Sequence, residues 1–142
     1  MQLYKNFCKE TTDENGKLTS FELVFPENYN FGYDVVDKMA ELAPNDTAVV
    51  WTNPEKEEKI FTYSDISRLS NKAANVFRNH GIKKGDKVLV ILKRNYEYWY
   101  VAPALHKLGA VIIPATNLLT QSDISYLSLI HISEPTRQEA IS

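Results

Sequence analysis

The sequence has one cysteine, few glycines and almost no net charge, and each scarcity excludes a class of protein. Cys8 has no partner for an internal disulfide, which fits a reducing compartment. The formal net charge of −2, without a basic block, leaves no electrostatic footprint for nucleic-acid binding. The longest apolar runs have the length of a strand, far short of the roughly 20 residues that a membrane-spanning helix needs.

A secretory signal peptide is not expected either, because charged side chains interrupt the first twenty residues. We therefore predict a cytoplasmic protein without a membrane span. Hydrophobic residues make up 44% and charged residues 24% of the 142 residues, which indicates one globular domain or part of one.

Short motifs that bind phosphate or supply a nucleophile are also missing. The five glycines lie too far apart for a phosphate-binding loop, and G-x-x-x-x-G-K, G-x-G-x-x-G and G-x-S-x-G do not occur. His80, His106 and His131 have no Cys or carboxylate at ligand spacing, and we assign His80 to a helix C-terminus and His106 to a helix surface. The sequence therefore predicts no catalytic, cofactor-binding or metal-binding residue.

The stretch Gly85–Thr120 predicts a strand, a helix and a second strand. Lys87–Leu92 is an apolar run with β-branched residues. Asn95 is a candidate helix N-cap, and Gly109 is a candidate helix end. Val111–Ile113 is the second apolar run. Two buried strands joined by a helix are typical of the parallel crossover, so the predicted fold class is α/β.

One proline and an aromatic cluster complicate the predicted helix. Pro103 removes a helical hydrogen bond and is expected to kink or restart the helix near Tyr100. The aromatic side chains before it either line a pocket or pack the helix onto the sheet, and packing is the commoner role; they are Tyr96, Tyr98, Trp99 and Tyr100.

The residues before this stretch divide into an arm and a helical part. Leu3–Phe7 predicts a short helix, and Asn15-Gly16 predicts a turn in a surface arm over residues 1–20. Phe21–Phe31 is broken by a proline and is expected to lie extended, with three of its aromatic rings buried. These rings are Phe25, Tyr29 and Phe31.

A helix and two strands follow the extended segment. Gly32–Ala43 has apolar residues at helical spacing, and Asp46–Trp51 and Lys59–Phe61 predict strands. Thr62 with Asp65 three residues later predicts a capping box at the start of the next helix. The apolar stripe of that helix predicts core packing; it comprises Ile66, Leu69, Ala73, Val76 and Phe77.

Four runs occur in a fixed order over most of Phe21–Tyr126. They are NFGYDVVD (30–37) with the strand after it, FTYSDI (61–66) continued by SNKAAN (70–75), GIKKGDKVLVIL (81–92) and LHKLGAVIIPATNLLT (105–120). Together they resemble the start of the adenylate-forming (AMP-binding) acyl-CoA synthetases, in the acetyl- and medium-chain branch. The resemblance implies strand–helix–strand units around a partial sheet, in the N-terminal part of the family's large domain.

The resemblance also implies a two-step ligase that uses ATP, CoA and Mg²⁺. A small-molecule carboxylate would attack the α-phosphate of ATP to give an acyl-adenylate and pyrophosphate, and the CoA thiol would then take the acyl group. The family's phosphate loop, ribose-binding Asp and C-terminal Lys have no counterpart here, so no catalytic residue is transferred. In mammalian medium-chain relatives the position matching Leu118 holds a Gln that contacts CoA, and Leu cannot make that hydrogen bond.

Two alternatives to this interpretation stay open. A peptide-synthetase adenylation domain or an aryl-CoA ligase shares these early motifs, with a different acceptor or acid. A stand-alone binding module belongs to another class, but its parallel sheet would show an unpaired edge. Oligomeric state is left open.

The last sixteen residues depart from the family pattern. Leu127–Arg137 (LSLIHISEPTR) resembles the in-frame translation of a transposase-type sequencing adapter, with a match at all eleven residues. A native amphipathic tail is the alternative. We therefore expect an arm at 1–20, a partial AMP-binding domain at 21–126 and a non-native tail at 127–142, inactive as a fragment.

Overall fold

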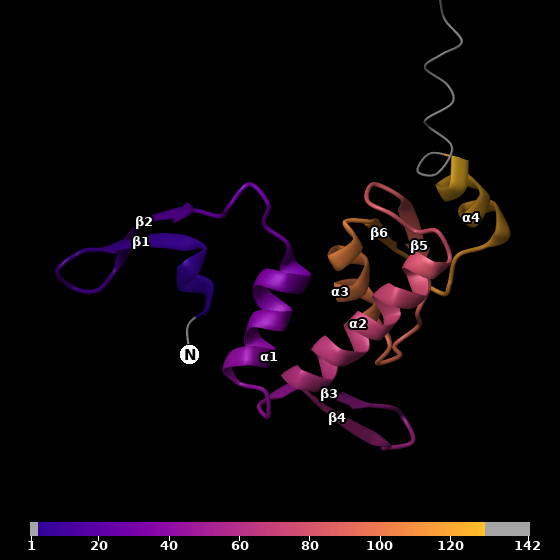
Figure 1. Cartoon of the computed structure of the whole chain (residues 1–142), viewed down its shortest axis with the longest axis horizontal. Helices are drawn as coiled ribbons and strands as arrows, with labels where there is room; N and C mark the ends of the chain where they lie inside the picture. Colours follow the sequence, from indigo (N-terminus) through magenta and orange to yellow (C-terminus); the bar gives the residue numbers. More distant parts are fainter. Residues whose placement is uncertain (1–2, 130–142) are drawn as a thin grey trace, which may run out of the picture.

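The computed structural model describes residues 3–129, in which helices alternate with three two-stranded sheets (Figure 1). The predicted α/β class is confirmed. The elements are η1 (Leu3–Asn6), β1 (Cys8–Thr12), β2 (Leu18–Leu23), η2 (Phe31–Asp37), α1 (Lys38–Leu42), β3 (Thr47–Thr52), β4 (Glu58–Thr62), α2 (Tyr63–Asn79), β5 (Lys87–Val90), α3 (Tyr98–Leu108), β6 (Val111–Pro114) and α4 (Gln121–Leu127). None of the helices in these residues is long and apolar enough to cross a membrane.

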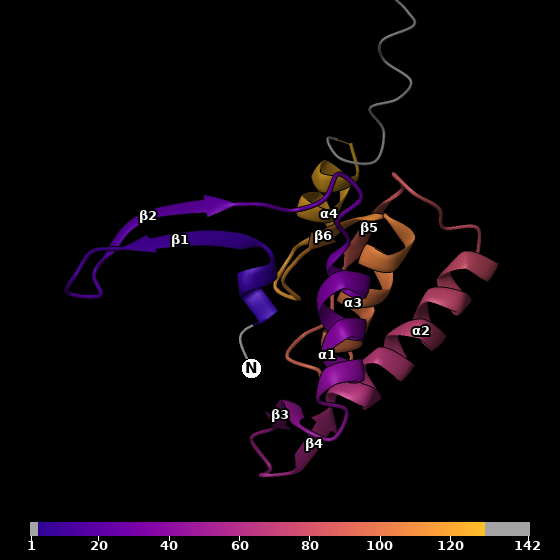
Figure 2. The ribbon, with the colours of Figure 1, turned by 60° about the vertical axis from the view of Figure 1, so that its left-hand side comes forward.

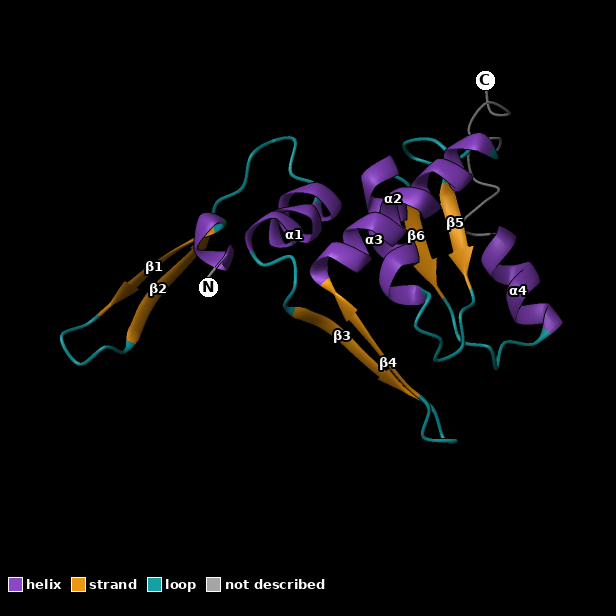
Figure 3. Ribbon diagram, turned by 60° about the horizontal axis from the view of Figure 1, so that its bottom comes forward, coloured by secondary structure: helices purple, strands orange, loops and turns teal. Residues whose placement is uncertain are grey.

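The predicted parallel crossover is present as β5–α3–β6, with both strands pointing the same way (Figure 3). Val88 lies opposite Ile112 in the parallel register. A buried cluster of Val90, Leu105 and Ala110 joins α3 to the two strands. Gly109 has a left-handed φ of 70° and ends α3, which confirms the predicted helix end. Burial of the apolar face of α3 against this sheet therefore organises the C-terminal half of the described chain.

Within the crossover, the predicted cap at Asn95 is wrong and the predicted restart at Pro103 is absent, while a kink at Pro103 stays a prediction. Asn95 does not cap the helix, because α3 begins at Tyr98 with Glu97 in the capping position and no side-chain cap bond. Instead, the Asn95 carbonyl accepts a hydrogen bond from the Tyr98 amide in a turn that precedes the helix. The helix also continues through Pro103 without restarting, and Pro103 is buried in it.

The N-terminal arm is a β-hairpin that projects away from the helices (Figure 2). The carboxylate of Asp13 accepts hydrogen bonds from the Asn15 and Lys17 amides, and this closes the predicted turn. The sequence predicts a surface arm with a turn at Asn15-Gly16 but not the two strands on either side of it, because alternating apolar residues occur in only one of them.

The predicted burial of three aromatic rings after the hairpin is wrong. Phe25, Tyr29 and Phe31 are 58%, 37% and 45% exposed. The loop between β2 and η2 packs rings on one another instead: Tyr29 contacts Phe7 and Phe25 with ring centres 5.1 and 5.8 Å apart. Phe7, Phe25 and Tyr29 therefore shield one another without entering a core, while Phe31 packs against His106.

The helical part follows the sequence pattern closely. Thr62 and Asp65 form the predicted capping box at the start of α2. Ile66 is buried at the start of the predicted stripe, while Val76 near the helix end is 52% exposed, so the stripe is covered over only part of its length. The predicted helix after Asn30 is present as the π-helix η2 followed by α1, and Asn30 caps it by accepting from two backbone amides.

Candidate functional site

The carboxyl ends of β5 and β6 lie side by side, which is where open α/β sheets bind their ligands. The strand ends, the loops that leave them and the start of α3 line an open hollow of about 470 Å³. Exposed Lys93, Arg94 and Asn95 contribute polar groups to it, and Trp99 and Pro114 contribute apolar surface. We take this hollow as the candidate functional site.

The β3–β4 hairpin holds the loop that carries these polar residues. The Trp51 indole nitrogen donates a hydrogen bond of 2.6 Å to the carbonyl oxygen of Arg94. The Tyr96 ring packs against the rings of Trp51 and Phe61, each with ring centres 5.3 Å apart. Aromatic contacts between the hairpin and the loop hold the loop in place, and they do so without burying a charged group.

Lys59 adds a polar contact to the same cluster. Its ammonium group donates to the Tyr96 hydroxyl at 2.9 Å and lies 4.1 Å from the centre of that ring. The hydrogen bond to Tyr96 raises the pKa of Lys59. The loop after β5 is therefore attached to β3 through Trp51 and to β4 through Lys59 and Phe61.

The candidate site can attract an anion but lacks the parts for covalent or metal chemistry. Lys93 and Arg94 place positive charge at its mouth. Among residues 3–129, no three His, Cys, Asp or Glu side chains gather where they could hold a metal ion. The prediction that no site residue lies in this chain stays a prediction.

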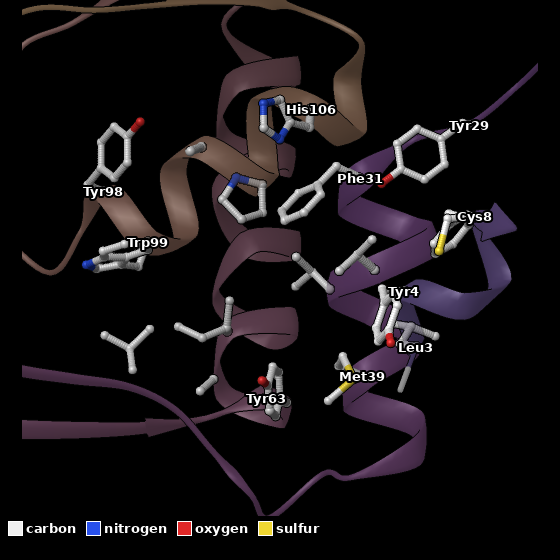
Figure 4. A pocket seen from close by; sticks show the side chains of 18 of the residues that line it. Leu3, Tyr4, Cys8, Tyr29, Phe31, Met39, Tyr63, Tyr98, Trp99 and His106 are labelled. Carbon is white, nitrogen blue, oxygen red and sulfur yellow. The ribbon is translucent and has the colours of Figure 1, made fainter. Parts of the chain in front are cut away.

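A larger apolar hollow of about 720 Å³ lies between the N-terminal hairpin and the helices (Figure 4). Leu3, Tyr4 and Cys8 face it from the arm, and Met39 and Trp99 face it from the helical side. Its lining is almost entirely hydrocarbon and aromatic, so it could accept apolar groups but could not polarise a reacting bond.

His106 lies at one end of this apolar hollow and not on the exposed helix surface that the sequence suggested. Its ring meets Phe31 edge-on at 5.7 Å, and its Nδ1 atom is buried without a hydrogen-bond partner among the described residues. Burial lowers the pKa of His106, so the neutral imidazole is favoured. His80 ends α2 as predicted, and His131 lies outside the described residues.

A buried lysine of α3, Lys107, connects this helix to η2 and α2, and the sequence did not predict it. The Lys107 ammonium lies 2.6 Å from Asp37 Oδ1, 2.9 Å from Ser70 Oγ and 2.7 Å from Asn71 Oδ1. Its side chain is 1% exposed. All three donors of the ammonium group are satisfied, which indicates a structural role. The available signal was a lysine near the end of a largely apolar helix, between Leu105 and Leu108.

The model of one protein family matches most of the described chain. Residues 36–129 match the family described as AMP-binding enzyme. This range includes β3, β4 and the whole β5–α3–β6 crossover.

Comparisons with individual proteins agree with that match. The mitochondrial acyl-coenzyme A synthetase ACSM3 of Homo sapiens is 36% identical over 112 residues, covering 75% of this chain and 19% of that protein. The mitochondrial acyl-coenzyme A synthetase ACSM4 of Rattus norvegicus is 35% identical over 122 residues, covering 82% of this chain and 21% of that protein. The chain thus spans about a fifth of the length of these relatives.

A solved structure with the same arrangement is a fatty acyl CoA synthetase of Mycobacterium tuberculosis. It has a TM-score of 0.62 and 27% sequence identity, over 70% of this chain and 19% of that one.

Proposed function

The chain belongs to the AMP-binding enzyme family, and from that premise we propose that it is part of an ATP-dependent, AMP-forming carboxylic acid–CoA ligase. The observation that carries the proposal is the family match over residues 36–129, which contains the complete β5–α3–β6 crossover. Sequence identities of 35–36% to two acyl-coenzyme A synthetases support CoA as the acceptor of the acyl group. The NFGYDVVD and SNKAAN runs favour a short- or medium-chain acid as substrate.

The reaction proposed for the whole protein has two displacement steps. A carboxylate oxygen attacks the α-phosphorus of ATP, the bond to the β-phosphate breaks, and pyrophosphate leaves. The CoA thiol, losing its proton, then attacks the acyl carbon of the adenylate, and AMP leaves. Mg²⁺ would supply charge neutralisation on the phosphates in such reactions.

The contribution of this segment is scaffolding. The β5–α3–β6 unit fixes two strands of the sheet, and the Trp51–Tyr96 contacts hold the loop with Lys93 and Arg94 at their carboxyl ends. No described cluster supplies a metal site, and the sequence lacks a phosphate-binding loop. The 142-residue chain alone is therefore proposed to be inactive.

The experiment is an ATP–pyrophosphate exchange assay on two proteins. The product of an uninterrupted gene is expected to exchange label only with a carboxylate present, and to release AMP when CoA is added. Straight-chain acids from acetate to decanoate define the preferred length. The 142-residue chain is expected to show no exchange; measurable exchange by it would contradict the proposed inactivity, and no exchange by the whole protein with any acid would contradict the ligase.

The domain division is proposed in the same way: an arm at 1–20, a partial AMP-binding domain at 21–126 and an adapter-derived tail at 127–142. The family match extends to residue 129, and residues 130–142 lie outside the described part of the chain. Sequencing the underlying DNA tests the tail. Genomic sequence on both sides of a segment that still encodes LSLIHISEPTR would contradict it.

Two further points separate this proposal from its alternatives. Transfer of the acyl group to a carrier protein in place of CoA would identify an adenylation domain, and a preference for aromatic acids would identify an aryl-CoA ligase. Cooperative unfolding of residues 1–126 as a soluble monomer would favour a stand-alone module.

Location in the cytoplasm also stays a prediction, because the names of the two curated relatives place those proteins in mitochondria. Fractionation of cells that express the whole protein from its own gene distinguishes these locations.

A further inference from the structure

The loop between β5 and α3, residues 91–97, is largely exposed and yet held in place. The Arg94 carbonyl accepts a hydrogen bond of 2.6 Å from the Trp51 indole, and the Tyr96 ring packs against the same indole with ring centres 5.3 Å apart. Surface loops are ordinarily among the more mobile parts of a fold. This loop is instead anchored to a hairpin that lies 43 residues earlier in the chain, while its side chains at 93 to 95 stay exposed.

The cations of this loop have no acidic partner in the described part of the chain. Within residues 3–129, no carboxylate lies at ion-pair distance from Lys93 or Arg94. The acidic residue of the loop, Glu97, does not line the hollow at the strand ends. Glu97 attracts Lys59 on the hairpin instead: the hydrogen bond to Tyr96 is the main cause of the raised pKa of Lys59, and the charge of Glu97 adds to it. The described residues therefore leave two positive charges uncompensated beside the hollow.

The peptide unit between Arg94 and Asn95 adds a neutral donor to these cations. It is a trans peptide, so its C=O and N–H groups point in opposite directions. Because the Arg94 carbonyl faces Trp51, the Asn95 N–H is turned away from the hairpin, and it has no hydrogen-bond partner among the described residues. Two cations beside a backbone N–H are donors that phosphate oxygens accept well.

We propose that Lys93 and Arg94 bind a phosphate group of a nucleotide substrate, and that Trp51 is a positioning residue that fixes their loop. The proposal rests on the proposed ligase function, whose two nucleotide substrates, ATP and CoA, both carry phosphates. It goes beyond the scaffolding role, and it differs from the sequence-based expectation that no binding residue lies in this chain.

The place and lining of the hollow suit such a ligand. It lies where the parallel strands β5 and β6 both end, which is the usual ligand position in open α/β sheets (Figure 3). Trp99 and Pro114 offer apolar surface to the organic part of a nucleotide. Two cations match a doubly charged phosphate better than a singly charged carboxylate.

The tether through Trp51 matters because ordering a loop on binding costs free energy. A loop that is already fixed in the free protein pays less of this cost when the ligand arrives. The hydrogen bond from Trp51 reaches the backbone of Arg94 and leaves its guanidinium group available. Trp51 is therefore expected to act on a bound phosphate only through the loop.

The first test measures KM for each substrate on the whole protein made from an uninterrupted gene. Pyrophosphate exchange gives KM for ATP and for the acid, and AMP release gives KM for CoA. Arg94→Gln is expected to raise KM for one nucleotide at least about tenfold, with kcat changed no more than about threefold. Lys87→Gln removes a charge from the exposed residue at the opposite end of β5 and is expected to leave every KM within about twofold.

The substrate whose KM rises decides the outcome. A rise for ATP alone or for CoA alone supports the proposal and shows which nucleotide supplies the phosphate. Unchanged KM values for both nucleotides, equal rises for both, a rise for the acid alone, or an equal effect of Lys87→Gln would overturn it.

The second test asks whether Trp51 acts through the two cations. Trp51→Phe keeps an aromatic ring beside Tyr96 but removes the indole N–H, and it is expected to raise the same KM about threefold with little change in kcat. In a protein that carries both Lys93→Gln and Arg94→Gln, the same change is expected to alter that KM no more than about 1.5-fold. A threefold effect in both backgrounds would show that Trp51 acts independently and would overturn its positioning role.

Direct binding separates this inference from the ligase function. If the whole protein exchanged no pyrophosphate with any acid, the proposed function would fail, and equilibrium dialysis with labelled ATP and labelled CoA would still test the inference. Arg94→Gln is then expected to weaken binding of one of these nucleotides at least about tenfold. Binding of neither nucleotide by the unchanged protein, or equal binding by the unchanged protein and the variant, would overturn the inference.

Discussion

Replacing Lys107 by Met removes an ammonium group from the point where η2, α2 and α3 meet, while keeping a side chain of similar length. Three oxygen atoms then lose a donor, from Asp37, Ser70 and Asn71. The Asp37 carboxylate is the most affected of the three, because it alone carries a charge.

The size of the loss follows from burial and from the remaining partners. Breaking a buried ion pair by removing one member typically costs about 3–5 kcal/mol. The Asp37 side chain is 24% exposed and still accepts a hydrogen bond of 2.7 Å from the Ser67 hydroxyl. Water and Ser67 therefore compensate part of the lost charge pairing, so we expect the lower end of that range, about 3 kcal/mol.

Urea denaturation of the complete chain, followed by far-UV circular dichroism, measures this loss. For a denaturant slope of about 2 kcal/mol per molar, the midpoint is expected to fall by about 1.5 M. Adding Asp37→Asn to Lys107→Met removes the uncompensated carboxylate and is expected to recover at least about 1 kcal/mol. Lys72→Met, on the exposed side of α2, is the control and is expected to stay within about 0.5 kcal/mol of the unchanged chain.

The reasoning is refuted if Lys107→Met lowers the free energy of unfolding by less than about 1 kcal/mol, because removing one member of a buried ion pair with three satisfied donors should destabilise the fold by more than that. It is also refuted if Lys72→Met costs as much, because the loss would then reflect charge alone and not position.

Three smaller predictions concern neighbouring features. Gly32→Ala places a Cβ 2.5 Å from Lys107 Cγ and 2.9 Å from the Pro103 carbonyl oxygen, and is expected to cost about 1–3 kcal/mol in the same urea assay. Thr62→Ala removes one half of the capping box with Asp65 and is expected to lower the free energy of unfolding by about 1 kcal/mol, with α2 helicity measured by circular dichroism. Burial lowers the pKa of His106 from 6.5, so as the pH drops the unfolded chain takes up a proton on this imidazole before the folded chain does. The free energy of unfolding is therefore expected to fall as the pH drops below about 6.5. In thermal melts at stepped pH, His106→Gln should remove this pH dependence.

Features encoded by near neighbours in the sequence were the ones that could be predicted. The capping box at Thr62 depends on a residue three positions away, and Gly109 ends α3 because a left-handed residue is needed there. The crossover followed from two short apolar runs with a helix between them. The start of α3 was less predictable, since Asn95 suits a turn as well as a cap and here takes the turn.

Features that depend on residues far apart in the sequence could not be predicted. Lys107 and Asp37 are 70 residues apart, and either would pass for an exposed helical charge in a linear pattern. The Trp51 contact with the Arg94 carbonyl depends on how a hairpin lies beside a loop 43 residues later. The exposure of Phe25, Tyr29 and Phe31 could not be predicted either. Hydrophobicity favours burial, but it does not show whether the fold brings another apolar surface into contact with the side chain.

The three separate sheets also bear on the order in which the molecule assembles. Each sheet pairs strands that follow one another in the chain: β1 with β2, β3 with β4 and β5 with β6. Local pairings close short loops and form quickly, whereas distant pairings slow folding. The two hairpins can thus form before the parallel β5–β6 pair, which has to close a longer crossover through α3. Hydrogen exchange should show the same division, with hairpin amides exchanging first and those of β5, α3 and β6 last.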